Sequence, residues 1–527
     1  MNLSVLLMNA ARAYPQRPAL TWGEVSLSYG EVQARVNALA AGFDNLGLRQ
    51  GDRLAFLMPN RPELLETMFG SFAQGLCIVP LNAQFKTDEV LHHVRDSGAV
   101  AIVYSSGHDQ VVAEARDQLR GVQVLVRLAE DERAGAGPSG TADYEQLLRD
   151  HAGAPAAPVD VHEHDVAWLF YTSGTTGRPK GAMLTVGNLL FAVAGWLADV
   201  VPLTVADITL HAAPLTHGAG FHALAATAKA AHQVLPRPGR FDPECVLDLM
   251  ENVGVTNTWL VPTQINRLVH SPAFRRERLA SLHTVVYGGA PFPLEDLKTA
   301  VRRMGPVLVQ IYGQGETPMT ATWLSREDHH LDRPDSDLLL RSAGRARTGT
   351  EVSIVDADGR SVPVGTLGEV VVRGPSVMKG YWQRPEVTQE VLRGGWLHTG
   401  DVGRLDARGY LQILDRMKDL IITGGSNVYA REVEEVLAMH PDVQATAVVG
   451  LPDRDWGERV VAAVVPMPGC SPSSADLLAH CSRRLADYKK PKAIHLMDAL
   501  PVNSYGKVLK RDLREALAGV DGVAPPS

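Results

Sequence analysis

A short apolar segment that leads directly into a loop rich in glycine and hydroxyl residues constrains this chain more than any other feature. Residues 166–171 read Val-Ala-Trp-Leu-Phe-Tyr, and the loop runs from Thr172 to Gly181. The aromatic and branched content of the first part, bounded by glycine, predicts a buried β-strand. Glycines in the loop let backbone N–H groups turn toward a common centre, and such concave turns bind anions. The segment therefore predicts a strand that ends in a polyphosphate-binding loop.

The side chains of this loop also favour phosphate binding. They combine hydroxyl donors, small residues and positive charge, in the set Thr172, Ser173, Gly174, Thr175, Thr176, Gly177, Arg178 and Lys180. A flexible connector would have a similar composition, but connectors seldom follow a buried strand or end in Pro-Lys-Gly. The loop also lacks the Gly-Lys-Ser/Thr ending of the phosphate loop of nucleoside triphosphatases. We therefore expect a triphosphate loop of a different family.

Composition limits the class of protein. The 527 residues carry a net charge of −8, and 45% are hydrophobic, which is typical of soluble globular proteins with several domains. The negative charge argues against a nucleic-acid partner, and without a run of 18 apolar residues we expect no membrane span. Cys77, Cys245, Cys470 and Cys481 form no Cys-x-x-Cys pair, which indicates a reduced compartment without structural zinc. We expect a cytoplasmic protein.

Strand-like and helical segments alternate along most of the chain, which predicts an α/β fold with mostly parallel sheets. Residues 129–158 are rich in Gly, Ala and Pro and predict a surface excursion, whereas residues 186–201 predict one long helix. Short strands and turns after residue 349 predict a β-rich subdomain. A further change near residues 415–418 predicts a boundary between a large N-terminal domain, 1–415, and a small α+β domain, 416–527.

Five motifs follow the loop in a fixed order. They are residues 286–291 (Val-Tyr-Gly-Gly-Ala-Pro), 311–317 (Ile-Tyr-Gly-Gln-Gly-Glu-Thr), 396–403 (Trp-Leu-His-Thr-Gly-Asp-Val-Gly), 415–428 (Asp-Arg-Met-Lys-Asp-Leu-Ile-Ile-Thr-Gly-Gly-Ser-Asn-Val) and 501–511 (Pro-Val-Asn-Ser-Tyr-Gly-Lys-Val-Leu-Lys-Arg). With the loop, they resemble the adenylate-forming superfamily of acyl-CoA synthetases, peptide-synthetase adenylation domains and firefly-type luciferases. The resemblance covers nearly the whole chain, from about Leu27 to Leu513.

The resemblance implies a reaction in two halves on one mobile, two-domain enzyme. A carboxylate attacks the α-phosphate of MgATP to give an acyl adenylate and pyrophosphate, and a thiol then displaces AMP to give a thioester. ATP, Mg²⁺ and coenzyme A are the implied cofactors. The small domain is implied to rotate between the halves, so that one site is used twice.

The resemblance also assigns nucleotide-binding roles. Glu316 would associate with magnesium and take part in catalysis, Asp401 would accept the ribose hydroxyls, and Tyr312 would stack on adenine. A core tyrosine, a solvated glutamate and an aspartate in an ordinary turn are the structural alternatives. The remaining residues implied to contact ATP are the loop set above without Arg178, together with Gly289, Ala290, Pro291, Gly313, Gln314 and Arg416.

One position departs from the family pattern. The residue before Glu316 is usually Thr or Ser, whose hydroxyl meets the α-phosphate region, and here it is Gly315. Either Thr317 or another donor replaces that contact, or adenylation is weaker than usual. The departure keeps open a catalytically weakened homologue that only binds adenylates.

In the small domain, Lys507 matches the lysine that bridges the substrate carboxylate and the α-phosphate, which makes it the strongest catalytic candidate. Lys418 falls at the hinge position. Gly424 and Gly425 match a loop that borders the tunnel for the pantetheine arm of coenzyme A. Lys510 and Arg511 are expected to stay solvated.

The acyl pocket is less defined by the sequence. His217, in the segment 214–222, is expected to gate the pocket near the carboxylate, and Trp259, Val261, Gly288, Gly313 and Met319 are expected to line it. Glycines among large apolar groups favour a hydrophobic acid, which is aliphatic, alicyclic or aromatic. We expect a carboxylic acid–CoA ligase. An acyl-AMP ligase that loads a separate acyl-carrier protein, an unrelated ATPase and a homodimer stay open as alternatives.

Overall fold

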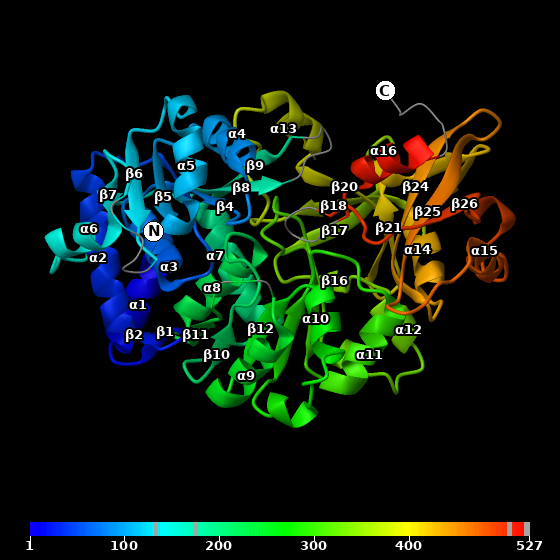
Figure 1. The fold of residues 1–527 in the computed structure, drawn as a ribbon, viewed down its shortest axis with the longest axis horizontal. Coiled ribbons are helices and arrows are strands. Elements are labelled where there is room, and N and C mark those ends of the chain that lie inside the picture. Colours follow the sequence, from blue (N-terminus) through cyan, green and yellow to red (C-terminus); the bar gives the residue numbers. More distant parts are fainter. Residues whose placement is uncertain are drawn as a thin grey trace.

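The structure is a computed structural model and describes residues 1–130, 135, 137–172, 178–237, 239, 241–502 and 508–520. Within these ranges the strands form four sheets, with helices on the faces of three of them (Figure 1). The predicted α/β class, with a large N-terminal part rich in parallel strands and a small C-terminal part, is confirmed. The first helix of the chain is α1 (Val5–Ala13).

Two large sheets form the N-terminal part. A seven-stranded sheet has the order β7-β6-β5-β3-β4-β8-β9, and a nine-stranded sheet has the order β16-β15-β14-β13-β12-β10-β11-β1-β2. Every residue of β4 and β5 is buried, as expected for parallel strands that are covered on both faces. The seven strands are β3 (Arg53–Leu57), β4 (Cys77–Leu81), β5 (Ala101–Ser105), β6 (Val124–Leu128), β7 (Ala142–Asp143), β8 (Val166–Thr172) and β9 (Lys180–Thr185).

The nine-stranded sheet carries most of the later motifs. Its strands are β1 (Pro18–Trp22), β2 (Val25–Ser28), β10 (Ile208–Leu210), β11 (His232–Leu235), β12 (Asn257–Leu260), β13 (Thr284–Tyr287), β14 (Leu308–Tyr312), β15 (Thr322–Leu324) and β16 (Arg345–Ala346). The helices of the two large sheets are α2 (Tyr29–Asn45), α3 (Pro62–Ala73), α4 (Thr87–Ser97), α5 (Asp109–Ala115), α6 (Tyr144–Asp150), α7 (Val186–Gly195), α8 (Gly218–Ala228), α9 (Pro243–Val253), α10 (Pro262–Val269), α11 (Leu294–Met304) and α12 (Ser336–Leu340).

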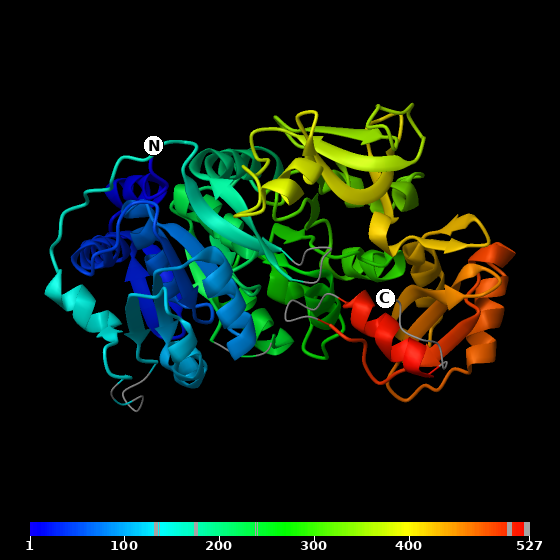
Figure 2. The same cartoon turned by 90° about the horizontal axis from the view of Figure 1, so that it is seen from above.

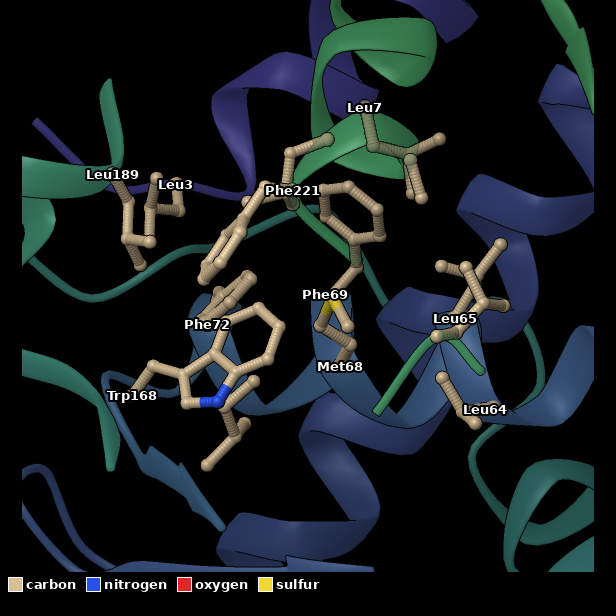
Figure 3. Packing of buried hydrophobic residues seen from close by; sticks show 14 of the residues in the cluster. Leu3, Leu7, Leu64, Leu65, Met68, Phe69, Phe72, Trp168, Leu189 and Phe221 are labelled. Atoms are coloured by element: carbon tan, nitrogen blue, oxygen red, sulfur yellow. The ribbon is translucent and has the colours of Figure 1, made fainter. Parts of the chain in front are cut away.

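A shared apolar core joins the two large sheets. Trp168 of β8 is fully buried, and its ring centroid lies 5.0 Å from that of Phe221 on α8. Figure 3 shows these two rings beside Phe69 and Phe72 of α3. Because this core fixes β8 against α8, it also fixes the start of the predicted phosphate loop, which follows β8.

The last two sheets are antiparallel or mixed. One contains β17 (Glu351–Val355), β18 (Gly368–Arg373), β19 (Leu392–Arg393), β20 (Trp396–Leu405) and β21 (Leu411–Arg416), with α13 (Pro385–Val391) beside it. The other contains β22 (Ile421–Thr423), β23 (Ser426–Val428), β24 (Val443–Asp453), β25 (Gly457–Pro466) and β26 (Ala493–Leu496). The chain changes from one sheet to the other between Arg416 and Ile421. Figures 1 and 2 show the residues from β22 onward as a separate lobe.

The C-terminal lobe has a core on each face of its sheet. Val448 packs with α14 (Ala430–Ala438) and α15 (Ser474–Ser482), whereas its neighbour Val449 packs with α16 (Lys510–Val520). Successive residues of a strand point to opposite faces, so β24 serves both cores. The lobe therefore combines helices and strands, in agreement with the predicted α+β class.

Two sequence-based expectations differ from the structure. Residues 129–158 were expected to be a surface excursion, but within them β7 extends a sheet and α6 packs on α2. Tyr144 of α6 is fully buried and its hydroxyl donates to Glu66 Oε2 at 2.9 Å. The long helix expected at 186–201 becomes a π-helical turn, η4 (Trp196–Val200), after α7. Leu147 and Leu148 of α6 are buried together with Tyr144, and these contacts explain the first difference.

A buried tyrosine–histidine pair lies where β13 leads into the motif at 286–291. Tyr287 OH and His329 Nε2 are 2.9 Å apart, and His329 Nδ1 lies 2.7 Å from the Ser325 carbonyl oxygen. The carbonyl only accepts, so Nδ1 carries the proton and Nε2 accepts from the tyrosine. Burial lowers the pKa of His329 to about 4, which keeps the imidazole neutral.

This pair predicts a pH dependence of stability. Above pH 6.5 His329 is neutral in the folded and unfolded chains, but between pH 6.5 and 4 only the unfolded chain binds the proton. Stability is therefore lost as the pH falls, by up to about 3 kcal/mol from this residue. We expect His329→Gln to reduce the fall in the free energy of unfolding between pH 7 and 4. Exposed His164 provides the control His164→Gln, and equal slopes for wild type and His329→Gln would contradict the assignment.

Candidate active site

The residues on either side of the predicted phosphate loop pair with each other in the seven-stranded sheet. β8 and β9 pair antiparallel, and Thr172 lies opposite Lys180. The Lys180 ammonium lies 5.5 Å from the ring centroid of Tyr381. The predicted phosphate-binding residues between these ends, Ser173, Gly174, Thr175, Thr176 and Gly177, lie outside the described residues, so their contacts stay predictions.

Thr172, at the start of this loop, contacts Glu316. This carboxylate is 6% exposed, and its Oε1 accepts hydrogen bonds from Thr172 Oγ1 at 3.0 Å and from Tyr381 OH at 2.7 Å. Burial, and then the charge of Glu316, raise the pKa of Tyr381, so the phenol stays protonated and donates. The structure thus brings Glu316 to the loop from a position 144 residues away in the sequence.

The donor set around Glu316 suits a magnesium ion that shares its ligands with a nucleotide. Both hydrogen bonds fall on Oε1, and carboxylate oxygens are hard ligands suited to Mg²⁺. Within the described ranges no group of three His, Cys, Asp or Glu residues could hold a metal alone. Mg²⁺ commonly takes several of its ligands from substrate phosphates and water, which fits a single carboxylate at this position.

Asp401 is the second buried carboxylate of the site. Its Oδ2 accepts from Tyr312 OH at 2.6 Å and from Gln314 Nε2 at 3.0 Å, while Arg416 Nε lies 3.2 Å from Oδ1. The β20–β21 register places Arg416 directly opposite Asp401. Burial disfavours the charged form of Arg416. Asp401 and other nearby charged groups together have the larger effect, so the pKa of Arg416 is raised. The predicted residues Tyr312, Gln314, Asp401 and Arg416 are therefore in mutual contact.

The loop predicted to contact adenine is exposed at the end of β13. Gly289, Ala290 and Pro291 are all solvent-accessible, and Gly289 has a φ of +80°, which favours glycine. A Cβ at Gly288 would lie 2.4 Å from the carbonyl oxygen of Ile311 on the adjacent strand. Glycine at 288 therefore allows β13 and β14 to approach closely, and β14 ends at Tyr312.

The structure explains the unusual glycine before Glu316. A Cβ at Gly315 would lie 2.4 Å from Phe170 Cδ1 and 2.7 Å from Thr172 Cγ2. Thr317 does not fill the gap, because its hydroxyl bonds to the backbone of Gln314 within the same turn. The space of the missing side chain is therefore occupied by β8, which also supplies the hydroxyl of Thr172 to Glu316.

Phe170, on the same face of β8 as Thr172, also contacts His217. His217 immediately precedes α8, and its ring centroid lies 4.7 Å from that of Phe170. A Cβ at Gly218 would lie 2.5 Å from the Trp259 ring, so glycine lets this ring approach the start of α8. Met319, at a φ of +58°, packs its backbone against Gly313. These residues were predicted to belong to the acyl pocket, and that role stays a prediction.

One expectation for the C-terminal lobe is wrong. Lys510 was expected to be solvated, but it is largely buried and pairs with Glu434 at 3.0 Å, whereas Arg511 is exposed as expected. Burial lowers the pKa of Lys418, and Gly424 and Gly425 form the left-handed turn between β22 and β23. Lys507 lies outside the described residues.

The sequence did not reveal Tyr381 and Phe170 as parts of the site. Tyr381 reaches Glu316 across 65 residues, through a bridge to Ala182 and a backbone bond between Met378 and Glu316. Phe170 was assigned only to a buried strand. Both contacts depend on chain crossings between sheets, and no local motif marks them.

Substitution of Gly315 tests this packing. We expect Gly315→Thr, which restores the usual family residue, to lower acid-dependent pyrophosphate exchange by about 10- to 100-fold, because the Cβ displaces Phe170 and Thr172 from Glu316. Gly121→Ala is the matched control, since a Cβ there meets open space. An unchanged or faster exchange in Gly315→Thr would contradict the prediction.

Comparison with known proteins agrees with this geometry. Residues 7–382 match the family model of the AMP-binding enzyme, and residues 432–507 match the AMP-binding enzyme C-terminal domain. The chain is 40% identical to feruloyl-CoA synthase from Amycolatopsis sp over 506 residues, which cover 96% of each chain. It is 34% identical to indoleacetate–CoA ligase from Aromatoleum aromaticum, with 98% of each chain covered.

Solved structures give the same result. The structure of the amide bond synthetase McbA from Marinactinospora thermotolerans aligns with a TM-score of 0.87 at 32% identity, covering 98% of this chain and 99% of that one. ATP-bound MatB from Rhodopseudomonas palustris aligns with a TM-score of 0.85 at 31% identity, covering 99% and 100%. Among the described residues no helix is long and apolar enough to cross a membrane. The chain belongs to the AMP-binding enzyme family of adenylate-forming enzymes.

Proposed function

We propose that this chain is an ATP-dependent carboxylic acid–CoA ligase that forms an acyl adenylate from a hydrophobic acid and then an acyl-CoA thioester. The observation that carries the proposal is the pair of buried carboxylates, Glu316 and Asp401, held at the end of β14 by donors from three sheets. Relatives named as CoA ligases match along nearly their whole length, and the neighbour MatB was solved with ATP bound.

Each carboxylate has a defined task in this proposal. Asp401 accepts the ribose hydroxyls, and its contacts with Arg416 and Tyr312 hold it oriented. Mg²⁺ at Glu316 supplies charge neutralisation on the triphosphate when it is bound. Tyr381 and Thr172 orient the Glu316 carboxylate through Oε1 and so fix the direction of Oε2. His217 borders the site of the reacting carboxylate, next to Phe170.

The domain division belongs to the same proposal. The chain leaves the sheet of β17–β21 at Arg416 and enters the last sheet at Ile421, which supports a hinge at Lys418. The turn at Gly424 and Gly425 would border the pantetheine tunnel during the second half-reaction. A Cβ at Gly424 would lie 2.8 Å from the Trp456 ring, so this turn needs glycine for packing as well as for φ.

A panel of carboxylic acids tests the proposed function. We expect AMP formation that depends on the acid, and an acyl-CoA product when coenzyme A is added. A product only with holo acyl-carrier protein would instead favour the carrier-loading activity of a relative, the fatty acid–[acyl-carrier-protein] ligase ScoC, which is 33% identical. AMP release that is independent of the acid, or absent with every acid, would overturn the proposal.

Lys507 provides the second test. We expect Lys507→Ala to abolish adenylate formation, because the ammonium offsets the negative charge that develops between the carboxylate and the α-phosphate. Thioester formation from supplied acyl adenylate should be largely retained, since that step uses the other domain orientation. Arg511→Ala, at an exposed site of the same lobe, is the control. Pyrophosphate exchange near the wild-type rate in Lys507→Ala would exclude the assigned role.

A further inference from the structure

Helix α4 lies behind the predicted phosphate loop, on the face of β8 that points away from Glu316. Phe170 and Thr172 lie on one face of this strand and Tyr171 on the other, because successive residues of a strand point to opposite faces. Tyr171 packs with apolar residues of α4, in a core separate from that of Phe170. Figure 1 shows α4 near the labelled strands β8 and β9. Side chains of α4 can therefore reach the chain on both sides of the loop.

His92 and Asp96 lie one helical turn apart on α4 and contact both ends of the loop. His92 Nε2 lies 3.0 Å from the carbonyl oxygen of Pro179, near the end of the loop. A carbonyl oxygen only accepts, so Nε2 carries a proton and donates the hydrogen bond. Asp96 Oδ2 accepts from the hydroxyl of Tyr171, immediately before the loop, at 3.0 Å. Two residues that share one face of α4 therefore hold the two ends of the loop.

A third contact joins α4 to the turn before α13, which carries Tyr381. Arg384 Nη2 lies 2.5 Å from Asp96 Oδ1, and the backbone N–H of Arg384 donates to the carbonyl oxygen of Tyr381 at 3.3 Å. The Asp96 side chain is 9% exposed and uses one oxygen for Arg384 and the other for Tyr171. Burial, and then the charge of Asp96, raise the pKa of Tyr171, so the phenol stays protonated and donates. Asp96 therefore connects the start of the loop with the turn that carries Tyr381.

The three segments that α4 contacts are the ones that place side chains around Glu316. The start of the loop carries Thr172 and the turn before α13 carries Tyr381, and both hydroxyls donate to Glu316 Oε1. The end of the loop carries Lys180, whose ammonium lies 5.5 Å from the ring centroid of Tyr381. These side chains come from distant parts of the sequence, and α4 bonds to all three segments. The distances between them therefore depend on His92 and Asp96.

We propose that His92 and Asp96 are positioning residues for MgATP in the first half-reaction. They hold the two ends of the phosphate loop, and the turn that carries Tyr381, at the separation that a bound triphosphate requires. This inference rests on the proposed ligase function. Groups that are fixed before a ligand binds avoid the cost of ordering them on binding. Both residues act from behind β8, so their loss should weaken the binding of ATP and leave the binding of the acid and coenzyme A unchanged.

The kinetics of His92→Ala test the proposal. In acid-dependent AMP formation we expect KM for ATP to rise about 10-fold, because the loss of one hydrogen bond lets the end of the loop shift, while KM for the acid and for coenzyme A is unchanged. His92→Gln keeps an Nε2 donor of similar reach and should restore most of the affinity for ATP. His108 provides the matched control His108→Ala, since its Nε2 also bonds to a backbone carbonyl oxygen, that of Ala83 at 2.9 Å, and KM for ATP should not change there.

Direct binding separates this role from a general loss of structure. Calorimetric titration with MgATP measures affinity without turnover, and thermal unfolding of the ATP-free protein checks the fold of each variant. Asp96→Asn keeps an acceptor for the Tyr171 hydroxyl but loses the charge beside Arg384. We expect Asp96→Asn and His92→Ala each to bind MgATP about 10-fold more weakly than wild type.

The possible outcomes distinguish this inference from the proposed function. Unchanged affinity for MgATP in folded His92→Ala and Asp96→Asn, or a rise in KM for the acid equal to that for ATP, would overturn the inference. Equal affinities for MgATP in His92→Gln and His92→Ala would also overturn it. A wild-type protein that binds MgATP but forms no AMP with any acid would count against the ligase function instead, and the titrations would still test the positioning role.

Discussion

Two buried carboxylates hold the site of this protein together. A charged group that is removed from water needs hydrogen-bond or ion-pair partners within the protein, and these partners come from several parts of the chain. Glu316 is bonded by Thr172 of the seven-stranded sheet and by Tyr381, which follows the β17–β18 hairpin. Asp401 is bonded by Tyr312 of the nine-stranded sheet and by Arg416 of its own sheet. Three sheets therefore meet at two acidic groups, and the proposed nucleotide site lies at their junction.

Much of the fold was predictable from the sequence because strands buried on both faces are continuous apolar segments. β8 was located this way, and the motif order then assigned Glu316, Asp401 and Arg416 to one site. The contact partners were less predictable. Tyr381 carries no local signal for its bond to Glu316, and Tyr144 of α6 carries none for its bond to Glu66.

Gly315 illustrates why a motif departure is hard to interpret without coordinates. From the sequence, the loss of a hydroxyl beside Glu316 indicated either a replacement donor or weakened chemistry. In the structure Phe170 and Thr172 occupy that space, and Thr172 bonds to Glu316. The glycine is therefore required by the position of β8. A sequence pattern records which residue is present, whereas packing decides whether a larger one would fit.

Packing against glycine also determines the shape of the predicted acyl pocket. Gly218 accommodates Trp259, Gly220 accommodates Trp168, and Gly313 accommodates the backbone of Met319. In each case a residue without a side chain faces a ring or a strained backbone from another element. The shape of such a pocket is set by pairs of positions, since enlarging one member requires the other to shrink or move. A change in the acid that is accepted would therefore be expected to involve paired substitutions.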